Sequence, residues 1–289
     1  MKLGVVFPKT DIDPDPIIIR DYAQAVEEMG YEYILIYDHV LGANPDRPEG
    51  WAGRPYSHHD SFHEPFVLFG YLAGLTKRLE FHTGVIVLPQ RQTALVAKQA
   101  AQVDILSGGR LVLGIGVGWN YVEYEALNEN FRNRGKRSEE QIALMRELWT
   151  KPLVTFNGKY HTVSDAGINP LPVQQPIPVW IGGGSDITLR RMAKMADGWY
   201  MNGEVNDELK ANLDTLRGYM ETEGRSMADF GLDGRPSAAG VPRSEWKKQF
   251  QAWQAIGATQ VAVNTMKAGL RSLDDHLQVL RDYKAEVSE

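Results

Sequence analysis

The chain has 289 residues and no cysteine among them. This absence excludes disulfide bonds, thiolate metal ligands and cysteine nucleophiles together. Any redox reaction at this protein therefore has to use a bound cofactor.

An excess of positive charge is also missing. The formal net charge is −6 and no local cluster of Lys and Arg offsets it, so the sequence lacks the electrostatic footprint of a nucleic-acid-binding protein. The apolar run Met1–Pro8 is too short for a signal peptide or a membrane span. We therefore expect a cytoplasmic protein that acts on a small molecule, with neither nucleic acid nor a membrane as partner.

Two motifs of hydrolytic enzymes are absent as well. The chain contains no G-x-S-x-G, the turn that carries the serine of α/β-hydrolases. His59 and His63 are four residues apart, but Asp60 stands where the H-E-x-x-H zinc motif has Glu, and Pro65 follows. We interpret these histidines as part of a polar pocket loop and expect no metal.

The sequence does contain a regular alternation of strand-length apolar runs with stretches of helical spacing. Such alternation is typical of βα units around a parallel sheet, and the length is near the ~250 residues of a (β/α)8 barrel. The eight runs are Leu3–Phe7, Tyr33–Tyr37, Leu79–Leu88, Leu111–Val117, Val179–Ile181, Trp199–Met201, Ser237–Ala239 and Val261–Val263. A doubly wound sheet gives a similar pattern, and the count of eight favours a TIM barrel formed by one domain, residues 1–289.

Two segments interrupt this alternation, after the second and the fourth predicted strands. The first is Gly42–His63, which is rich in Pro, Gly, Trp and His, and the second is Pro152–Pro178. In the second, the pair Asn157-Gly158 predicts a two-residue hairpin turn. Because insertions after barrel strands commonly form substrate loops, we expect both segments to line the substrate pocket.

Three glycines and a serine, Gly182, Gly183, Gly184 and Ser185, lie between a predicted strand and a predicted helix. Glycines let backbone N–H groups approach a phosphate, and the N-terminus of a helix adds partial positive charge. We interpret this segment as a phosphate-binding cradle. The alternative is a tight turn that only requires positive φ.

Alternate glycines, Gly114, Gly116 and Gly118, occupy the predicted fourth strand and end at Trp119. They remove side chains from one face of the strand, which suits a flat ring lying across it, whereas the alternative is a close-packed barrel interior. The order G-x-G-x-G differs from the G-x-G-x-x-G of dinucleotide-binding folds, so this set is not a dinucleotide fingerprint.

Asp38 and His39 end the predicted second strand, where barrel enzymes place catalytic residues. A histidine in this position can exchange a proton with a bound ring near neutral pH. The alternative is a structural histidine held by hydrogen bonds.

Six motifs occur in order along the chain. They are Tyr37-Asp38-His39, Thr83–Pro89, Leu113–Trp119, Val179–Gly183, Ala196–Trp199 and Val263–Met266. Together they resemble the bacterial-luciferase-like family of flavin- and deazaflavin-dependent oxidoreductases, especially the branch that uses coenzyme F420. The resemblance implies a (β/α)8 barrel, often dimeric, with the cofactor ring at the C-terminal mouth and a cis peptide bond between Gly84 and Val85.

The resemblance also assigns site residues by position. The residues implied to lie around the ring are Asp38, His39, Thr83, Gly84, Val85, Ile86, Gly116, Gly118 and Trp119, and those implied to bind the phosphate are Gly182, Gly183, Gly184 and Ser185. The family's sugar-phosphate dehydrogenases have a proton-donating Glu where this chain has Trp119, and a Lys near Val205 that this chain lacks. That substrate is therefore not expected. Glu123 is the nearby carboxylate that remains, and Arg190 or Asn202 would have to assist the backbone amides at the phosphate.

We thus expect an F420-dependent oxidoreductase that transfers a hydride between reduced coenzyme F420 and a small organic substrate. The catalytic candidates are His39, Asp38 and Glu123, with His39 as proton donor or as a stabiliser of the ring, and we expect a homodimer. One alternative is an FMNH2-dependent monooxygenase of the same family, with FMN as cofactor. Others are a non-redox barrel that binds a phosphorylated substrate, such as an isomerase or lyase, and a carrier without turnover.

Overall fold

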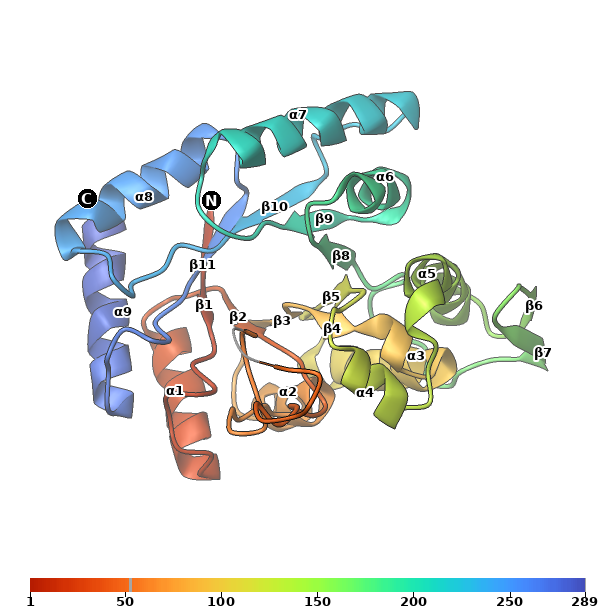
Figure 1. Ribbon diagram of the computed structural model, residues 1–289, viewed down its shortest axis with the longest axis horizontal. Helices are drawn as coiled ribbons and strands as arrows, with labels where there is room; N and C mark the ends of the chain where they lie inside the picture. Colours follow the sequence, from red (N-terminus) through yellow and green to blue (C-terminus); the bar gives the residue numbers. More distant parts are fainter. Residues whose placement is uncertain (52–53, 289) are drawn as a thin grey trace.

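The computed structural model describes residues 1–51 and 54–288. Eight parallel strands form a closed barrel, and its third strand is divided in two. In chain order the barrel strands are β1 (Lys2–Val6), β2 (Tyr33–Ile36), β3 (Glu80–Thr83) with β4 (Ile86–Val87), β5 (Leu111–Gly116), β8 (Val179–Gly182), β9 (Gly198–Tyr200), β10 (Gly231–Gly234) and β11 (Gln260–Val263). The pairing of β1 with β11 and of β3 with β5 closes the circle. The predicted TIM barrel is confirmed (Figure 1).

The strands read as continuous apolar runs because both of their faces are buried. Along β2, Tyr33 and Leu35 belong to a cluster inside the barrel together with Trp180. Ile34 and Ile36 belong to the larger cluster between the strands and the helices. Successive side chains of a strand point to opposite faces, so each position here needs an apolar residue.

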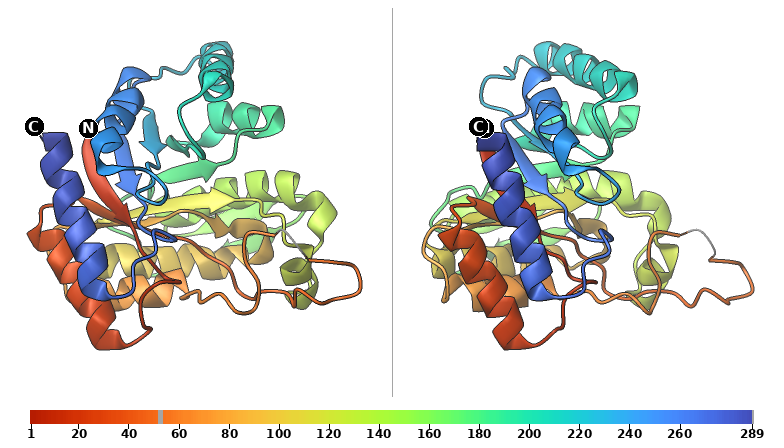
Figure 2. Two further views of the ribbon diagram at one scale, coloured as in Figure 1. Left: turned by 60° about the vertical axis from the view of Figure 1, so that its left-hand side comes forward. Right: turned by 90° about the vertical axis from the view of Figure 1, so that its left-hand side faces the viewer.

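Helices surround the barrel (Figure 2). They are α1 (Pro16–Glu28), α2 (Pro65–Ala73), α3 (Thr93–Ser107), α4 (Tyr121–Ala126), α5 (Arg134–Thr150), α6 (Asp186–Met195), α7 (Asp207–Thr222), α8 (Arg243–Ala255) and α9 (Leu273–Ser288), with single 3₁₀ turns at Leu88–Gln90 and Phe131–Asn133. In α1 the buried Ile19, Tyr22 and Val26 recur at helical spacing, and Asp15 caps the amide of Ile17 at 2.6 Å. Within the described part of the chain no helix is long and apolar enough to cross a membrane.

The seventh strand is not where the sequence predicts it. The prediction Ser237–Ala239 is wrong, because Ser237 forms only an isolated bridge with Asn264, and the strand is β10. A Cβ atom at Gly231 or Gly234 would collide with the ring of Trp180 or of Trp253. Positions 231 and 234 therefore need glycine to leave room for these indole rings. Because of these glycines, β10 lacks the run of apolar residues by which the other strands are recognised in the sequence.

The predicted third strand, Leu79–Leu88, is interrupted. Its two parts, β3 and β4, are separated by Gly84 and Val85. The peptide bond between these two residues is cis, as the resemblance implies.

The two insertions lie at opposite ends of the barrel. The segment after β2 lies at the C-terminal mouth, where the hydroxyl of its Tyr56 accepts from Asn120, the N-cap residue of α4, at 2.7 Å. Residues 52 and 53 of this insertion are outside the described part of the chain. The second segment, 152–178, follows a helix, α5, and leads into β8. Its Gln174 donates to the carbonyl of Leu111, the first residue of β5, at 2.9 Å. It lies at the N-terminal end, so the expectation that it lines the substrate pocket is wrong.

The second insertion contains a hairpin of β6 (Val154–Asn157) and β7 (Thr162–Ala166), at the periphery of the molecule beyond α5 (Figure 1). Asn157 pairs with Thr162, and the Gly158 amide donates to the His161 carbonyl at 2.9 Å. The hairpin loop thus has four residues, 158–161, and the prediction of a two-residue turn is wrong. Glu140 of α5 accepts hydrogen bonds from amides of this loop, which holds the longer turn.

Candidate active site at the barrel mouth

Three adjoining cavities extend across the C-terminal mouth. The first, of about 360 Å³, contains Gly183, Gly184 and Asn202. The second, of about 570 Å³, shares Asn202 and continues to Tyr37 and Asn264. The third, of about 270 Å³, shares Tyr37 and Asn264 and reaches His39. The predicted cradle and the predicted histidine therefore lie at the two ends of a row of adjoining cavities, which we call the cleft.

His39 lines the third of these cavities and a further one of about 440 Å³, and one of its ring nitrogens is fixed. Its ring is stacked on Tyr56 with centroids 3.8 Å apart. Its Nδ1 lies 3.2 Å from Oε2 and 3.3 Å from Oε1 of Glu123. Because a carboxylate only accepts, Nδ1 carries a hydrogen, and Nε2 is the nitrogen left for a substrate.

Glu123 is enclosed and has no exposed side-chain surface. Its carboxylate accepts hydrogen bonds from the Val40 amide at 2.7 Å, from Gln90 at 3.1 Å and from Tyr56 at 3.3 Å. Burial raises its pKa, but the hydrogen bonds from His39 and Gln90 outweigh that effect, and the pKa of Glu123 is below its ordinary value. The geometry makes Glu123 a positioning residue for His39, because it does not line the three mouth cavities.

Asp38 does not line the three cavities described above, but it lines a fourth, of about 440 Å³, together with His39 and Arg91. It is 3% exposed, its Oδ1 accepts from Arg91 at 2.9 Å, and its Oδ2 accepts from the Val87 amide at 3.3 Å. Burial raises the pKa of Asp38 in spite of the nearby guanidinium. Asp38 therefore joins the end of β2 to the segment after β4 and supports His39 from behind.

Val85 is the residue of the 83–86 segment that reaches the mouth. Thr83 and Ile86 are fully buried, and the Thr83 hydroxyl donates to the Gly114 carbonyl at 2.7 Å. A Cβ atom at Gly116 would lie 2.6 Å from Val85 Cγ2, and one at Gly182 would lie 3.0 Å from Val85 Cγ1. Half-buried Val85 thus packs against Gly116 and Gly182, at the C-terminal ends of β5 and β8.

The alternate glycines of β5 make room for protein atoms. Val85 fills the space beside Gly116, and Val87 Cγ1 would lie 2.5 Å from a Cβ at Gly118. The interpretation that Gly116 and Gly118 open a face for a ring is corrected by this packing, and the alternative of a close-packed interior applies to them. Trp119, which follows them, packs on Trp51 at 5.4 Å and on Tyr56 at 5.2 Å between ring centroids, beside His39.

The turn after β8 offers unpaired amide groups. Gly183 has φ of +115°, and its carbonyl accepts from the Trp199 indole at 2.7 Å, which fixes the turn. Among the described residues the amides of Gly183, Gly184 and Ser185 have no hydrogen-bond acceptor. Ser185 is the N-cap residue of α6. Free amides beside a helix N-terminus provide the donors that a phosphate requires.

Arg190 and Asn202 differ in their relation to this turn. Arg190 is exposed, forms an ion pair with Asp186 at 2.9 Å and lies over the Tyr219 ring, so the structure does not bring it to the cradle. Asn202 does line the cavity, and its Oδ1 accepts from Arg235 at 3.2 Å. Its amide group remains available as a donor.

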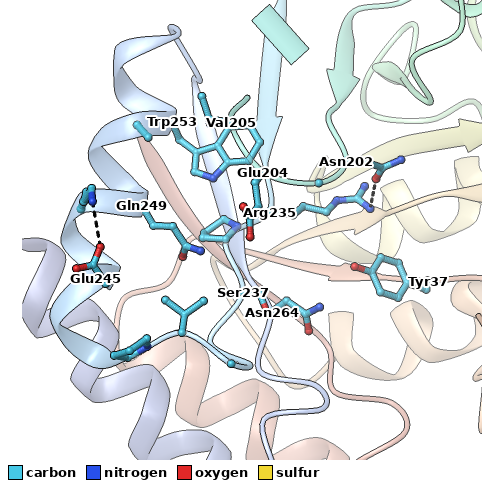
Figure 3. Close-up of a pocket in the computed structure, with 17 residues that line it drawn as sticks. Tyr37, Asn202, Glu204, Val205, Arg235, Ser237, Glu245, Gln249, Trp253 and Asn264 are labelled. Atoms are coloured by element: carbon cyan, nitrogen blue, oxygen red, sulfur yellow. Dashed lines mark hydrogen bonds and ion pairs between the residues drawn. The ribbon is translucent and has the colours of Figure 1, made fainter. Parts of the chain in front are cut away.

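Arg235 is a mouth residue that the sequence reasoning missed. Its guanidinium lies between Asn202 and Tyr37 (Figure 3), 5.5 Å from the centre of the Tyr37 ring and 5.3 Å from that of Tyr200. Arg235 directly follows β10, and the residue after a barrel strand is a candidate site residue. Because the seventh strand was predicted at Ser237–Ala239, Arg235 was not recognised as such a residue. Tyr56, Arg91 and Lys9 were also missed, since their roles depend on contacts distant in sequence.

The closed parallel barrel and the polar groups at its strand ends define the class: a TIM barrel with an enzyme-type mouth site. Comparison with known families makes the class specific. The family model described as luciferase-like monooxygenase matches residues 3–281, so the chain belongs to this family.

Its relatives divide between two cofactors. An uncharacterised protein of Mycobacterium tuberculosis is 36% identical over 210 residues, which cover 71% of this chain and 72% of that protein. An F420-dependent glucose-6-phosphate dehydrogenase of Amycolatopsis mediterranei is 32% identical over 221 residues, or 72% of this chain and 60% of the dehydrogenase. An FMNH2-dependent dimethylsulfone monooxygenase of Pseudomonas putida is 29% identical over 212 residues, or 72% of this chain and 54% of the monooxygenase.

Solved structures share the fold at low identity. A monooxygenase of Streptomyces bottropensis superposes with a TM-score of 0.81 at 14% identity and covers 100% of this chain and 99% of its own. An F420-dependent secondary alcohol dehydrogenase superposes with a TM-score of 0.80 at 15% identity, over 100% of both chains. Both likenesses concern the fold alone: this chain shares the barrel architecture of these two enzymes over its whole length.

Proposed function

We propose that the protein is an F420-dependent oxidoreductase that transfers a hydride between the reduced deazaflavin and a small organic substrate. When bound, the deazaflavin supplies or accepts the hydride. The observation that carries the proposal is His39, whose Nδ1 is fixed by an ionised, buried carboxylate while its ring lines a cavity at the mouth.

The protein's part of the reaction is a proton transfer at His39 Nε2. In reduction, a doubly protonated His39 donates its Nε2 proton to the substrate oxygen and keeps the hydrogen on Nδ1. Glu123 stabilises the charged ring before the transfer and holds the neutral ring in the correct tautomer afterwards. In oxidation, Nε2 accepts the same proton.

The residues around the cleft fit a cofactor that carries a phosphate. The amides of Gly183, Gly184 and Ser185 lack acceptors, and Asn202 has a free amide group beside them. The described residues that line this cavity include no Lys or Arg, so neutral donors and the α6 N-terminus would hold the phosphate. Val85 would contact the ring. The name of the Amycolatopsis relative supports the choice of F420.

A second candidate is an FMNH2-dependent monooxygenase, which the relative from Pseudomonas putida favours. The two candidates are separated by titrating the purified protein with F420 and with FMN and following ligand fluorescence and thermal stability. We expect quenching and a higher midpoint with F420 at lower concentrations than with FMN. No response to F420 would contradict the proposal, and oxygen consumption with reduced FMN would favour the monooxygenase.

The family resemblance also supports the proposal that the protein is a cytoplasmic homodimer. Sedimentation equilibrium of the purified protein tests the oligomeric state, and a monomer at micromolar concentration would contradict that part.

A further inference from the structure

Lys9 is a buried lysine at the mouth that has no carboxylate partner. It follows β1, is 5% exposed, and its Nζ lies 3.2 Å from the centre of the Phe62 ring. Its recorded hydrogen bond goes to the carbonyl of Ser61 at 3.3 Å. Among residues 1–51 and 54–288 it takes part in no ion pair within 4.0 Å. A buried charge is seldom left unpaired, so a partner from outside the chain would complete this site.

The nearby carboxylates are engaged with the protein backbone. Asp60 accepts from the amide and the hydroxyl of Ser57 at 2.7 and 3.3 Å. Asp11 accepts from the Lys267 amide at 2.7 Å. Burial lowers the pKa of Lys9 to about 8, with Asp60 acting in the opposite direction. At neutral pH the Lys9 side chain therefore still carries its proton and presents a positive charge.

Lys9 lines the same cavity as His39. This cavity of about 270 Å³ lies where the ends of β1, β2 and β11 converge, and Lys267 adds a second ammonium group at its edge. The other walls include Tyr56, Phe62 and Met266. Asp60 also lines this cavity, with its Oδ2 engaged by the amide and hydroxyl of Ser57. The cavity thus combines two ammonium groups and one carboxylate with an aromatic and apolar body, and His39 stands beside it.

We infer that this cavity binds a small organic acid, with its carboxylate at Lys9 and Lys267 and its apolar body against Phe62 and Met266. A single carboxylate can pair with the buried ammonium group of Lys9, and a hydrocarbon or aromatic body can pack against the apolar walls. The site distinguishes an acid from its neutral amide, because only the acid compensates the buried charge. The inference rests on the proposed function only in placing the reacting carbon of this acid beside His39.

Binding is tested without any cofactor, using benzoate and its neutral analogue benzamide as probes. The methyl carbons of the nine methionines are labelled with ¹³C, and the Met266 signal is assigned with a Met266→Leu variant. We expect benzoate to shift the Met266 signal saturably, with an affinity about 10- to 100-fold higher than that of benzamide. Equal affinities for the two probes would overturn the inference.

Variants separate charge from packing. Lys9→Met should remove the preference for benzoate, and Lys9→Arg should keep it. If Lys9→Met does not fold, Lys267→Met at the exposed edge should reduce the preference. The matched control is Lys248→Met, which removes an exposed lysine that lines the adjoining cavity and pairs with Glu245 at 3.3 Å. A preference that survives both Lys9→Met and Lys267→Met in folded protein would overturn the inference. Because F420 is absent from these titrations, failure of the cofactor to bind leaves their result intact.

Discussion

At the scale of single residues, the site depends on a histidine that is oriented by a carboxylate 84 positions away in sequence. Glu123 collects hydrogen bonds from the chain segment that follows His39 and from the ring itself. One side chain thus fixes both the backbone and the tautomer at the reacting nitrogen. This arrangement assigns different tasks to two residues that the sequence grouped together as catalytic.

Replacing His39 with Gln should lower kcat by about 10²- to 10⁴-fold and leave the Kd for F420 unchanged, because the proton donor is lost. Glu123→Gln should lower kcat by about 10- to 100-fold, since the ring loses its ionised partner. The two residues act as one unit, so the double variant should be no slower than His39→Gln alone. Steady-state kinetics of the three variants give the answer, and additive losses would contradict a shared role.

Asp233 supplies a pH dependence of stability. It is fully buried in the barrel, where its carboxyl accepts from Tyr33 at 3.1 Å, and burial raises its pKa to about 7. Between about pH 4 and pH 7 the folded protein therefore holds a proton that the unfolded chain has released, and stability falls as pH rises. Relative to Asp233→Asn, the wild type should lose about 2 kcal/mol of unfolding free energy from about pH 5 to about pH 7.

Urea titrations of both proteins at the two pH values measure this difference. A wild-type stability that rises relative to the variant over that range would contradict a raised pKa at Asp233.

The sequence identified His39 because a strand end in a barrel is a strong positional signal. It did not show that Asp38 pairs with Arg91, or that Lys9 is buried under Phe62, since both contacts join residues about 50 positions apart. Such pairs become visible only when the barrel places several strand ends side by side.

At the scale of elements, glycine has three different purposes in this barrel. In β10 it gives space to the indole rings of Trp180 and Trp253, and in β5 it gives space to valines. At Gly183 it provides a positive φ beside amides that have no acceptor and border a cavity. The sequence showed where glycines gather, but the purpose of each depends on which neighbour occupies the space.

The cradle is tested by a pair of matched glycine substitutions. Gly183→Ala should raise the Kd for F420 by about 10- to 100-fold, because the turn must shift and its amides lose their direction. Gly224→Ala is the control. Gly224 lies after α7 and also has a positive φ, +68°, but a Cβ atom added there would have no atom within 4 Å. An alanine at either position has a strained backbone, so thermal stability should fall in both variants. Isothermal titration should show weaker F420 binding only in Gly183→Ala. Unchanged binding by a folded Gly183→Ala protein would exclude the cradle.

At the scale of the whole molecule, the two ends of the barrel have separate tasks. The loops after β1, β2, β9, β10 and β11 surround the mouth cavities, whereas the β6–β7 hairpin forms a separate sheet whose loop is held by Glu140 of α5. The sequence predicted the barrel because eight strands and their helices follow simple periodicities. The hairpin was expected at the substrate pocket because the composition of an insertion does not show whether it follows a strand or a helix. Segment 152–178 follows a helix, α5.

This division predicts that the hairpin can be removed without loss of function. Val154 pairs with Ala166, so a Gly-Asn turn can replace residues 155–165 with little strain. We expect kcat, KM and the Kd for F420 to stay within a factor of about two, since none of the excised residues lines a mouth cavity. The melting temperature should fall by ~2–4 °C through the lost burial of Phe156 against the core. A tenfold rise in KM on this deletion would return the hairpin to the substrate pocket and contradict the arrangement of the two ends.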